Sequence, residues 1–253
     1  MHLRRRQHGF TLIELLVVIA ITSLLVGILL PSLDTARQIG RRAYCQVNLR
    51  LLASANDLYQ SDNEGLYAPG AANFLKNRDR WFGRRSGPTG PFQEGGPLTE
   101  YLGTSRVRQC PSFQDYLVGF EAGCGGYGYN NNFVGQLRRS PDYRLKTDRT
   151  GNRHEVFSNP SQTVAFTDAA MVDGGLIEYS FAESPRWPDF DARPRPSIHF
   201  RHLTLANAAW LDGHVSAESM SFSGGVVDYY EGNPADYQVG WFGPDGNDLF
   251  DCQ

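Results

Sequence analysis

The chain has 253 residues, of which 41% are hydrophobic and 20% are charged, and its formal net charge is −3 at neutral pH. Three arginines lie in residues 4–6, and the chain after residue 9 keeps 21 Lys and Arg, the 24 of the whole chain less these three, against 27 Asp and Glu. Such an acidic chain lacks the clustered cations of non-specific nucleic-acid binding. The four cysteines contain no CxxC pair, which argues against a zinc ribbon or a thioredoxin-like site.

An apolar segment near the N-terminus predicts a membrane-spanning helix. Glu14 is the only charged residue from Phe10 to Leu30. A helix of this length extends roughly 31 Å at 1.5 Å per residue, which matches a hydrocarbon core of about 30 Å. The basic residues 1–9 precede this span, so the positive-inside rule places them in the cytoplasm. We therefore expect a single-pass inner-membrane protein whose globular part is extracytoplasmic.

Two export signals are alternatives to a retained anchor. A cleaved secretory signal peptide needs small residues after the apolar stretch, and residues 30–36 offer no A-x-A site. A twin-arginine signal is disfavoured for the same reason, and because the apolar segment is longer than such signals need.

Glu14 lies four residues into the expected span, where a carboxylate costs on the order of 3 kcal/mol and usually has a partner. Residues 9–15, Gly-Phe-Thr-Leu-Ile-Glu-Leu, resemble the signature of type IV prepilins and type II secretion pseudopilins. The resemblance implies that a membrane-bound prepilin peptidase cuts between Gly9 and Phe10 and methylates the new N-terminal Phe10. Glu14 would then pair with the terminal amine of a neighbouring subunit and set the subunit register.

The pattern after Pro31 predicts that the helix continues to about Asp62, before a turn at residues 63–65. Apolar residues spaced three or four apart form the expected packing stripe, which comprises Tyr44, Val47, Leu51, Ala55 and Leu58. Arginines flank this stripe at positions 37, 41, 42 and 50. This half of the helix is therefore expected to lie against the globular body.

Residues 65–151 are rich in Gly, Pro, Asn and Tyr, which predicts loops and short irregular elements. A disulfide between Cys110 and Cys124 would close roughly a 15-residue loop and contribute about 3 kcal/mol. Four cysteines permit three pairings, so the sequence leaves the connectivity open.

Two later segments, 163–168 and 202–210, have the composition of strands, and Asp212-Gly213 supplies turn chemistry after the second. An antiparallel sheet packed on the long helix is the expected result. The tail 224–253 is aromatic and acidic, which favours packing or pairing at a sheet edge.

The spacing from His202 to Asp212-Gly213 resembles the H-X9-DG signature of a large prepilin-like family of planctomycete-type bacteria. Other segments agree with this resemblance, namely Arg42–Cys45, Asn48–Leu49, Cys110–Ser112, Tyr127–Asn130, Arg201 and Asn207. The resemblance extends from Gly9 to Val215 and leaves the aromatic tail uncovered.

His202, Asp212 and His214 could be metal ligands, since imidazole and carboxylate suit zinc. We favour a structural role, in which His202 forms a hydrogen bond across a hairpin and Asp212-Gly213 makes a turn. No nucleophile elbow, phosphate loop or HExxH motif is present in the sequence. The sequence therefore predicts no catalytic residue, no cofactor and no enzyme.

The predicted fold class is α+β and pilin-like, with a long N-terminal helix packed on an antiparallel sheet with loop-rich insertions. The expected segments are a leader (1–9), a transmembrane helix (10–33), its amphipathic continuation (34–63) and a globular domain (64–253) with the signature at 202–213. The resemblance implies assembly with other pilin-like subunits into a type IV pilus or type II secretion-type filament. The alternative is a membrane-tethered binding or metal-dependent enzyme domain that uses the prepilin segment only for export and anchoring.

Overall fold

The computed structural model describes residues 10–72, 76–103, 107–114, 116–136, 150–188, 192–224 and 230–251. The expected leader, with Gly9 of the expected cleavage site, lies outside these residues, as does Cys252.

One helix, α1, spans Leu12–Asp62 and contains 51 residues, with Pro31 inside it. It ends at the residue where its end was predicted. Gly65 lies in the left-handed region and its N–H bonds the carbonyl of Gln60, which closes the helix C-terminus. Contacts divide the chain into two compact units, residues 1–40 and 41–253, and α1 runs through both.

The first unit contains the N-terminal part of α1. This helix is long and apolar enough to cross a membrane, by length and composition, and none of its most apolar window is buried. Exposed fractions of its large apolar side chains include 80% for Leu12 and 61% for Leu30. The predicted apolar span is therefore helical from Leu12 onward.

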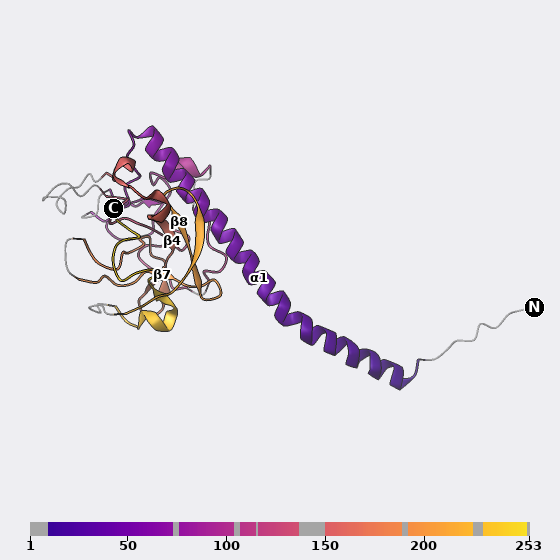
Figure 1. Cartoon of the computed structure of the whole chain (residues 1–253). Coiled ribbons are helices and arrows are strands. Elements are labelled where there is room, and N and C mark those ends of the chain that lie inside the picture. The colour runs from indigo at the N-terminus through magenta and orange to yellow at the C-terminus, as the bar shows by residue number, and fades with distance from the viewer. Residues whose placement is uncertain are drawn as a thin grey trace, which may run out of the picture. The chain divides into compact units, whose positions relative to one another are not determined.

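The second unit is built on a four-stranded antiparallel sheet with the order β3-β4-β8-β9. These strands are β3 (Tyr127–Tyr129), β4 (Val164–Asp168), β8 (Leu205–Trp210) and β9 (Val215–Ser219). Every residue of β4 is buried, so this strand lies at the centre of the packing. Figure 1 shows the C-terminal part of α1 along the sheet that contains β4 and β8. The α+β class and the antiparallel sheet packed on the long helix are confirmed.

Six shorter strands form three antiparallel pairs in the described residues. They are β1 (Asp79–Arg80) with β2 (Gly83–Arg84), β5 (Met171–Val172) with β6 (Leu176–Ile177), and β7 (Ile198–His199) with β10 (Val239–Gly240). Short 3-10 helices span Thr99–Leu102, His154–Val156, Pro160–Gln162 and Pro234–Tyr237.

The face of α1 that packs on the sheet differs from the predicted stripe. The buried residues are Cys45, Asn48, Leu49, Leu52, Ala53, Ala55 and Asn56. Of the predicted stripe only Ala55 is among them, whereas Tyr44, Val47, Leu51 and Leu58 are 42–53% exposed. The predicted stripe was based on apolar residues alone. The buried face instead includes two asparagines, whose side chains form hydrogen bonds with residues of the sheet. The stripe was therefore assigned to the wrong side of the helix.

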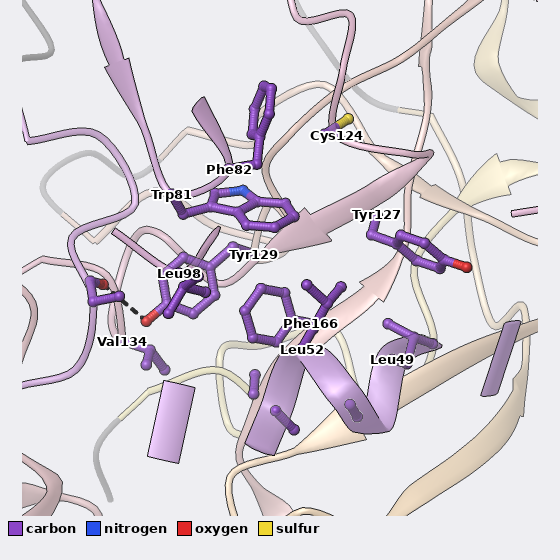
Figure 2. Close-up of a cluster of buried hydrophobic side chains, with 14 of the residues drawn as sticks. Leu49, Leu52, Trp81, Phe82, Leu98, Cys124, Tyr127, Tyr129, Val134 and Phe166 are labelled. Carbon is purple, nitrogen blue, oxygen red and sulfur yellow. Dashed lines mark hydrogen bonds between the residues drawn. The ribbon is translucent and has the colours of Figure 1, made fainter. Parts of the chain in front are cut away.

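Aromatic side chains fill the space between α1 and the sheet (Figure 2). Leu49 and Leu52 belong to the same buried cluster as Trp81 and Phe166. The rings of Tyr129 and Phe166 stack with centroids 4.6 Å apart, and Trp81 meets Phe166 edge-on at 5.3 Å. The indole N–H of Trp81 donates to a backbone carbonyl at 2.7 Å, so this buried donor is satisfied.

The C-terminal tail contributes to a second buried cluster. Trp241, Phe242 and Phe250 are at most 2% exposed and pack with Phe200 and Trp210. β10, which precedes Trp241, pairs with β7. The predicted packing of the tail is confirmed for its described residues.

Candidate functional site

The start of α1 is a capping box. Thr11 precedes the first helical residue, Leu12, and its N–H and Oγ1 both donate to Glu14 Oε2 at 2.8 Å. In return, Glu14 N–H donates to Thr11 Oγ1 at 3.2 Å. This reciprocal pattern satisfies donors at the helix N-terminus that would otherwise lack partners. The Thr-x-x-Glu spacing of residues 11–14 signals this cap in the sequence, although only an intersubunit role was predicted for Glu14.

The cap leaves part of the Glu14 carboxylate available. Both bonds end on Oε2, and Oε1 accepts no bond among the described residues. Phe10, which would carry the new terminal amine after cleavage, is 74% exposed. Glu14 can therefore cap its own helix and still offer one oxygen to a cation from another chain.

The predicted bridge between Cys110 and Cys124 is wrong. Cys110 is bonded to Cys45 of α1, with Cα atoms 5.4 Å apart, and Cys124 is buried and free. The prediction chose a pair close in sequence, whereas the fold brings together residues separated by 65 positions. A loop of this size contributes about 4 kcal/mol in the chain-entropy model. Within the second unit, the bridge ties the C-terminal part of α1 to the segment that contains Cys110.

His202 of the signature lies in a buried polar cluster centred on Asp168. Its Nε2 is 3.2 Å from Asp168 Oδ2 and 3.7 Å from Cys110 Sγ. Asn207 donates to the same carboxylate oxygen through its backbone N–H at 2.7 Å and its side chain at 2.8 Å. Arg201 Nη2 donates to Asp168 Oδ1 at 2.9 Å. His202, Asn207 and Arg201 of the signature thus meet at Asp168, which the signature does not include.

Electrostatics fixes the protonation of Asp168 and of the neighbouring His199. Burial raises the pKa of Asp168, but Arg201, His202 and Asn207 more than offset it, so the pKa is below its ordinary value and the carboxylate is ionised. Burial, followed by the positive charge of Arg201, lowers the pKa of the neighbouring His199 to about 3. The buried His199 ring is therefore neutral at physiological pH.

Asp212, Gly213 and His214 form the turn between β8 and β9. Gly213 has φ +85°, a conformation that favours glycine. The backbone N–H of His214 donates to Asp212 Oδ1 at 3.1 Å, and its ring lies flat on Trp210 at 5.5 Å. The side chains of Asp212 and His214 are 37% and 47% exposed, whereas that of His202 is fully buried. His202, Asp212 and His214 do not form a metal-ligand group in the described structure.

Two buried asparagines of α1 fix the helix on the sheet. Asn48 Nδ2 donates to the hydroxyl of Tyr127 at 3.0 Å, and Asn56 Nδ2 donates to that of Tyr129 at 3.2 Å. Asn56 Oδ1 also accepts from the backbone N–H of Ala68 at 3.0 Å. Two asparagines eight positions apart on α1 thus form hydrogen bonds with two tyrosines two positions apart on β3. The role of Asn56 was missed, although a polar residue within an apolar helical face is a usable signal.

Comparisons with known proteins agree with the N-terminal geometry. Residues 4–30 match the family described as the prokaryotic N-terminal methylation motif. The chain is 38% identical over 68 residues to the type IV wide pilus major component PilA4 of Thermus thermophilus, which covers 27% of this chain and 52% of that protein. It is 33% identical over 60 residues to the type II secretion system core protein G of Pseudomonas aeruginosa, or 24% of this chain and 42% of that protein.

The chain therefore spans about half the length of the curated relatives it matches. No solved structure matches it. The motif and the relatives together support a prepilin-like chain with an apolar N-terminal helix suited to membrane anchoring. Both relatives are named as components of a pilus or a secretion system rather than as enzymes.

Proposed function

We propose that this chain is a pilin-like subunit that a prepilin peptidase cleaves between Gly9 and Phe10 and that then assembles with other pilin-like subunits into a type IV pilus or type II secretion-type filament. Before assembly, α1 anchors it in the inner membrane with the leader in the cytoplasm and the globular unit outside. The methylation motif at residues 4–30 and the two named relatives support this proposal.

The observation that carries the proposal is the exposed apolar stripe of α1 in the globular unit. This stripe consists of Tyr44, Val47, Leu51 and Leu58, which are 42–53% exposed. A simple membrane anchor needs only its span, and these residues follow that span. Burying the exposed halves of four such side chains contributes about 3–6 kcal/mol. An apolar helical face of this kind is typical of a surface that packs on another helix.

Glu14 is the second element of the proposal. Its free Oε1 would accept the terminal amine of Phe10 from a neighbouring subunit, once cleavage has created that amine. A buried ion pair of this type specifies register more than it adds stability. Glu14→Gln keeps the size of the side chain and removes its charge, so we expect processing to continue and filament formation to decrease strongly.

Processing is tested by expressing the full chain with and without a prepilin peptidase and determining the mature N-terminus by intact mass and peptide sequencing. The expected product begins at Phe10 and carries one added methyl group. Gly9→Val should block cleavage. A chain that stays uncut, or one cut beyond Leu30, would contradict the proposal and favour the membrane-tethered domain.

Assembly is tested by changing the exposed stripe. The double variant Val47→Ser, Leu51→Ser should be processed and folded but should form few filaments in electron micrographs of cells that express the assembly machinery. The control is Arg50→Ser, which alters an exposed side chain between the two and should retain filaments. Equal filament numbers for the double variant and the control would refute a role for the stripe.

A further inference from the structure

A buried group of soft ligand atoms lies inside the globular unit. The Sγ atoms of Cys45 and Cys110 and one ring nitrogen of His202 lie within 4.8 Å of one another. Among the described residues no other set of three or more such ligands meets this criterion. We propose that, after reduction of the disulfide, these three side chains bind a zinc-like divalent metal ion, and that the disulfide is the closed state of the same site.

The donor set suits zinc. Two thiolates and one imidazole are ligands of zinc sites, with Zn–S distances of about 2.3 Å and Zn–N distances of about 2.0–2.1 Å. Tetrahedral geometry at those lengths places the two sulfurs about 3.8 Å apart. The Cα atoms of Cys45 and Cys110 are 5.4 Å apart. Opening of the sulfur–sulfur bond and small side-chain rotations therefore suffice to bring the two sulfurs to the separation that a metal ion needs. Thiolate ligands also select zinc over calcium or magnesium.

Asp168 completes the surroundings of this site. Its Oδ2 lies 3.2 Å from His202 Nε2, the ring nitrogen that is also 3.7 Å from Cys110 Sγ. The carboxylate, held in place by Arg201 and Asn207, is not one of the three grouped ligands, so it lies beside the site and orients the His202 ring. A divalent ion neutralises two thiolates just as Arg201 neutralises Asp168. The buried cluster therefore keeps zero net charge when the metal binds, which limits the desolvation penalty.

The redox step balances within this cluster. Reduction adds two electrons and two protons to the Cys45–Cys110 bond, and the sulfurs become two thiols. A tertiary phosphine can act as reductant, because it becomes the phosphine oxide by taking the oxygen of a water molecule. The metal ion then displaces the two thiol protons into solvent. The metal replaces the disulfide as the cross-link between α1 and the segment at Cys110.

The test uses the full chain in detergent micelles, reduced with a tertiary phosphine that is then removed, and titrated with Co²⁺. The expected result is uptake of one ion per chain, with the visible bands of tetrahedral cobalt and thiolate-to-cobalt charge transfer, both lost when Zn²⁺ is added. Each ion bound should release two protons. Alkylation followed by peptide mapping should show that Zn²⁺ slows the alkylation of Cys45 and Cys110 at least tenfold. This measurement uses the wild-type chain, so it does not depend on whether a variant folds.

Variants locate the ligands. His202→Ala should weaken Co²⁺ binding by roughly 100-fold or more, since loss of outer-shell partners alone weakens metal sites 10–100-fold. Cys124→Ser, the matched control at the buried free cysteine, should bind as the wild type does, and the oxidised chain should not bind. The proposal is overturned if the reduced wild-type chain takes up no metal, whether or not that chain is still folded. It is also overturned if Zn²⁺ does not protect Cys45 and Cys110 from alkylation, or if His202→Ala binds Co²⁺ as tightly as the wild type.

Discussion

Leu51 and Leu52 are adjacent in α1 and have opposite environments, so they provide a direct test of how the helix packs. Leu52 is 1% exposed and lies in the aromatic cluster between helix and sheet, whereas Leu51 is 42% exposed. The apolar spacing of the sequence predicts the reverse, with Leu51 in the packing stripe. Replacing each leucine by alanine in turn separates the two arrangements with the same chemical change.

The expected magnitudes follow from burial. Leu52→Ala removes a fully buried side chain and leaves a cavity, which lowers the free energy of unfolding by about 3–4 kcal/mol. Leu51→Ala removes a side chain that is only a little more than half buried, so it should lower this free energy by about 1 kcal/mol. In a domain of about 200 residues, 1 kcal/mol shifts Tm by about 2–4 °C. The Leu52 variant should therefore melt roughly 6–16 °C lower.

The assay is thermal unfolding of the full chain in detergent, followed by near-ultraviolet circular dichroism of the buried tryptophans and tyrosines. Wild type and both variants are compared under non-reducing conditions so that the Cys45–Cys110 bridge is intact. If Leu51→Ala destabilised the chain more than Leu52→Ala, the packing face described for α1 would be incorrect. In the filament assay we expect the reverse ranking, because Leu51 belongs to the exposed stripe proposed to pack on other subunits.

Three further predictions concern side chains in the C-terminal part of α1. Asn56→Ala leaves the buried N–H of Ala68 without its acceptor and should lower the free energy of unfolding by about 2–3 kcal/mol in the same melting assay. The control Ser54→Ala, on the exposed side of the helix, should have little effect. If the two variants lost similar amounts of stability, the role given to Asn56 would be refuted. Cys45→Ser removes the bridge and should lower the free energy of unfolding by about 4 kcal/mol in non-reducing buffer. If the wild-type chain, reduced in the absence of metal, were as stable as the oxidised wild-type chain, this prediction would be contradicted. Burial, with a smaller contribution from Asp212, raises the pKa of Asp57 from 3.8 to about 6. The folded state therefore binds this proton more tightly than the unfolded state does, and the stability gained in this way is lost as the pH rises through about 6. Asp57→Asn should flatten the melting profile between pH 4 and 6, and an unchanged profile would argue against the shift.

Features that depend on neighbouring residues could be predicted from the sequence alone. The apolar run that begins at Phe10 predicts a helix long enough to span a membrane, and the turn residues after Asp62 mark where α1 ends. The β-branched and aromatic run that ends at Asp168 predicts β4. These elements were accessible because hydrophobic periodicity and turn chemistry act over a few residues. The capping box at Thr11 and Glu14 is equally local and could have been predicted from its spacing.

Features that depend on residues distant in sequence could be assigned only from the packed fold. The buried face of α1 contains Asn48 and Asn56, and burying them is favourable only because tyrosines of β3 supply partners. Cys110 pairs with Cys45 rather than with nearer Cys124, because the helix brings Cys45 within bonding distance. A polar side chain or a thiol can pair in many ways along an unfolded chain. Only the packed fold, which places one partner in reach and buries the rest, selects among them.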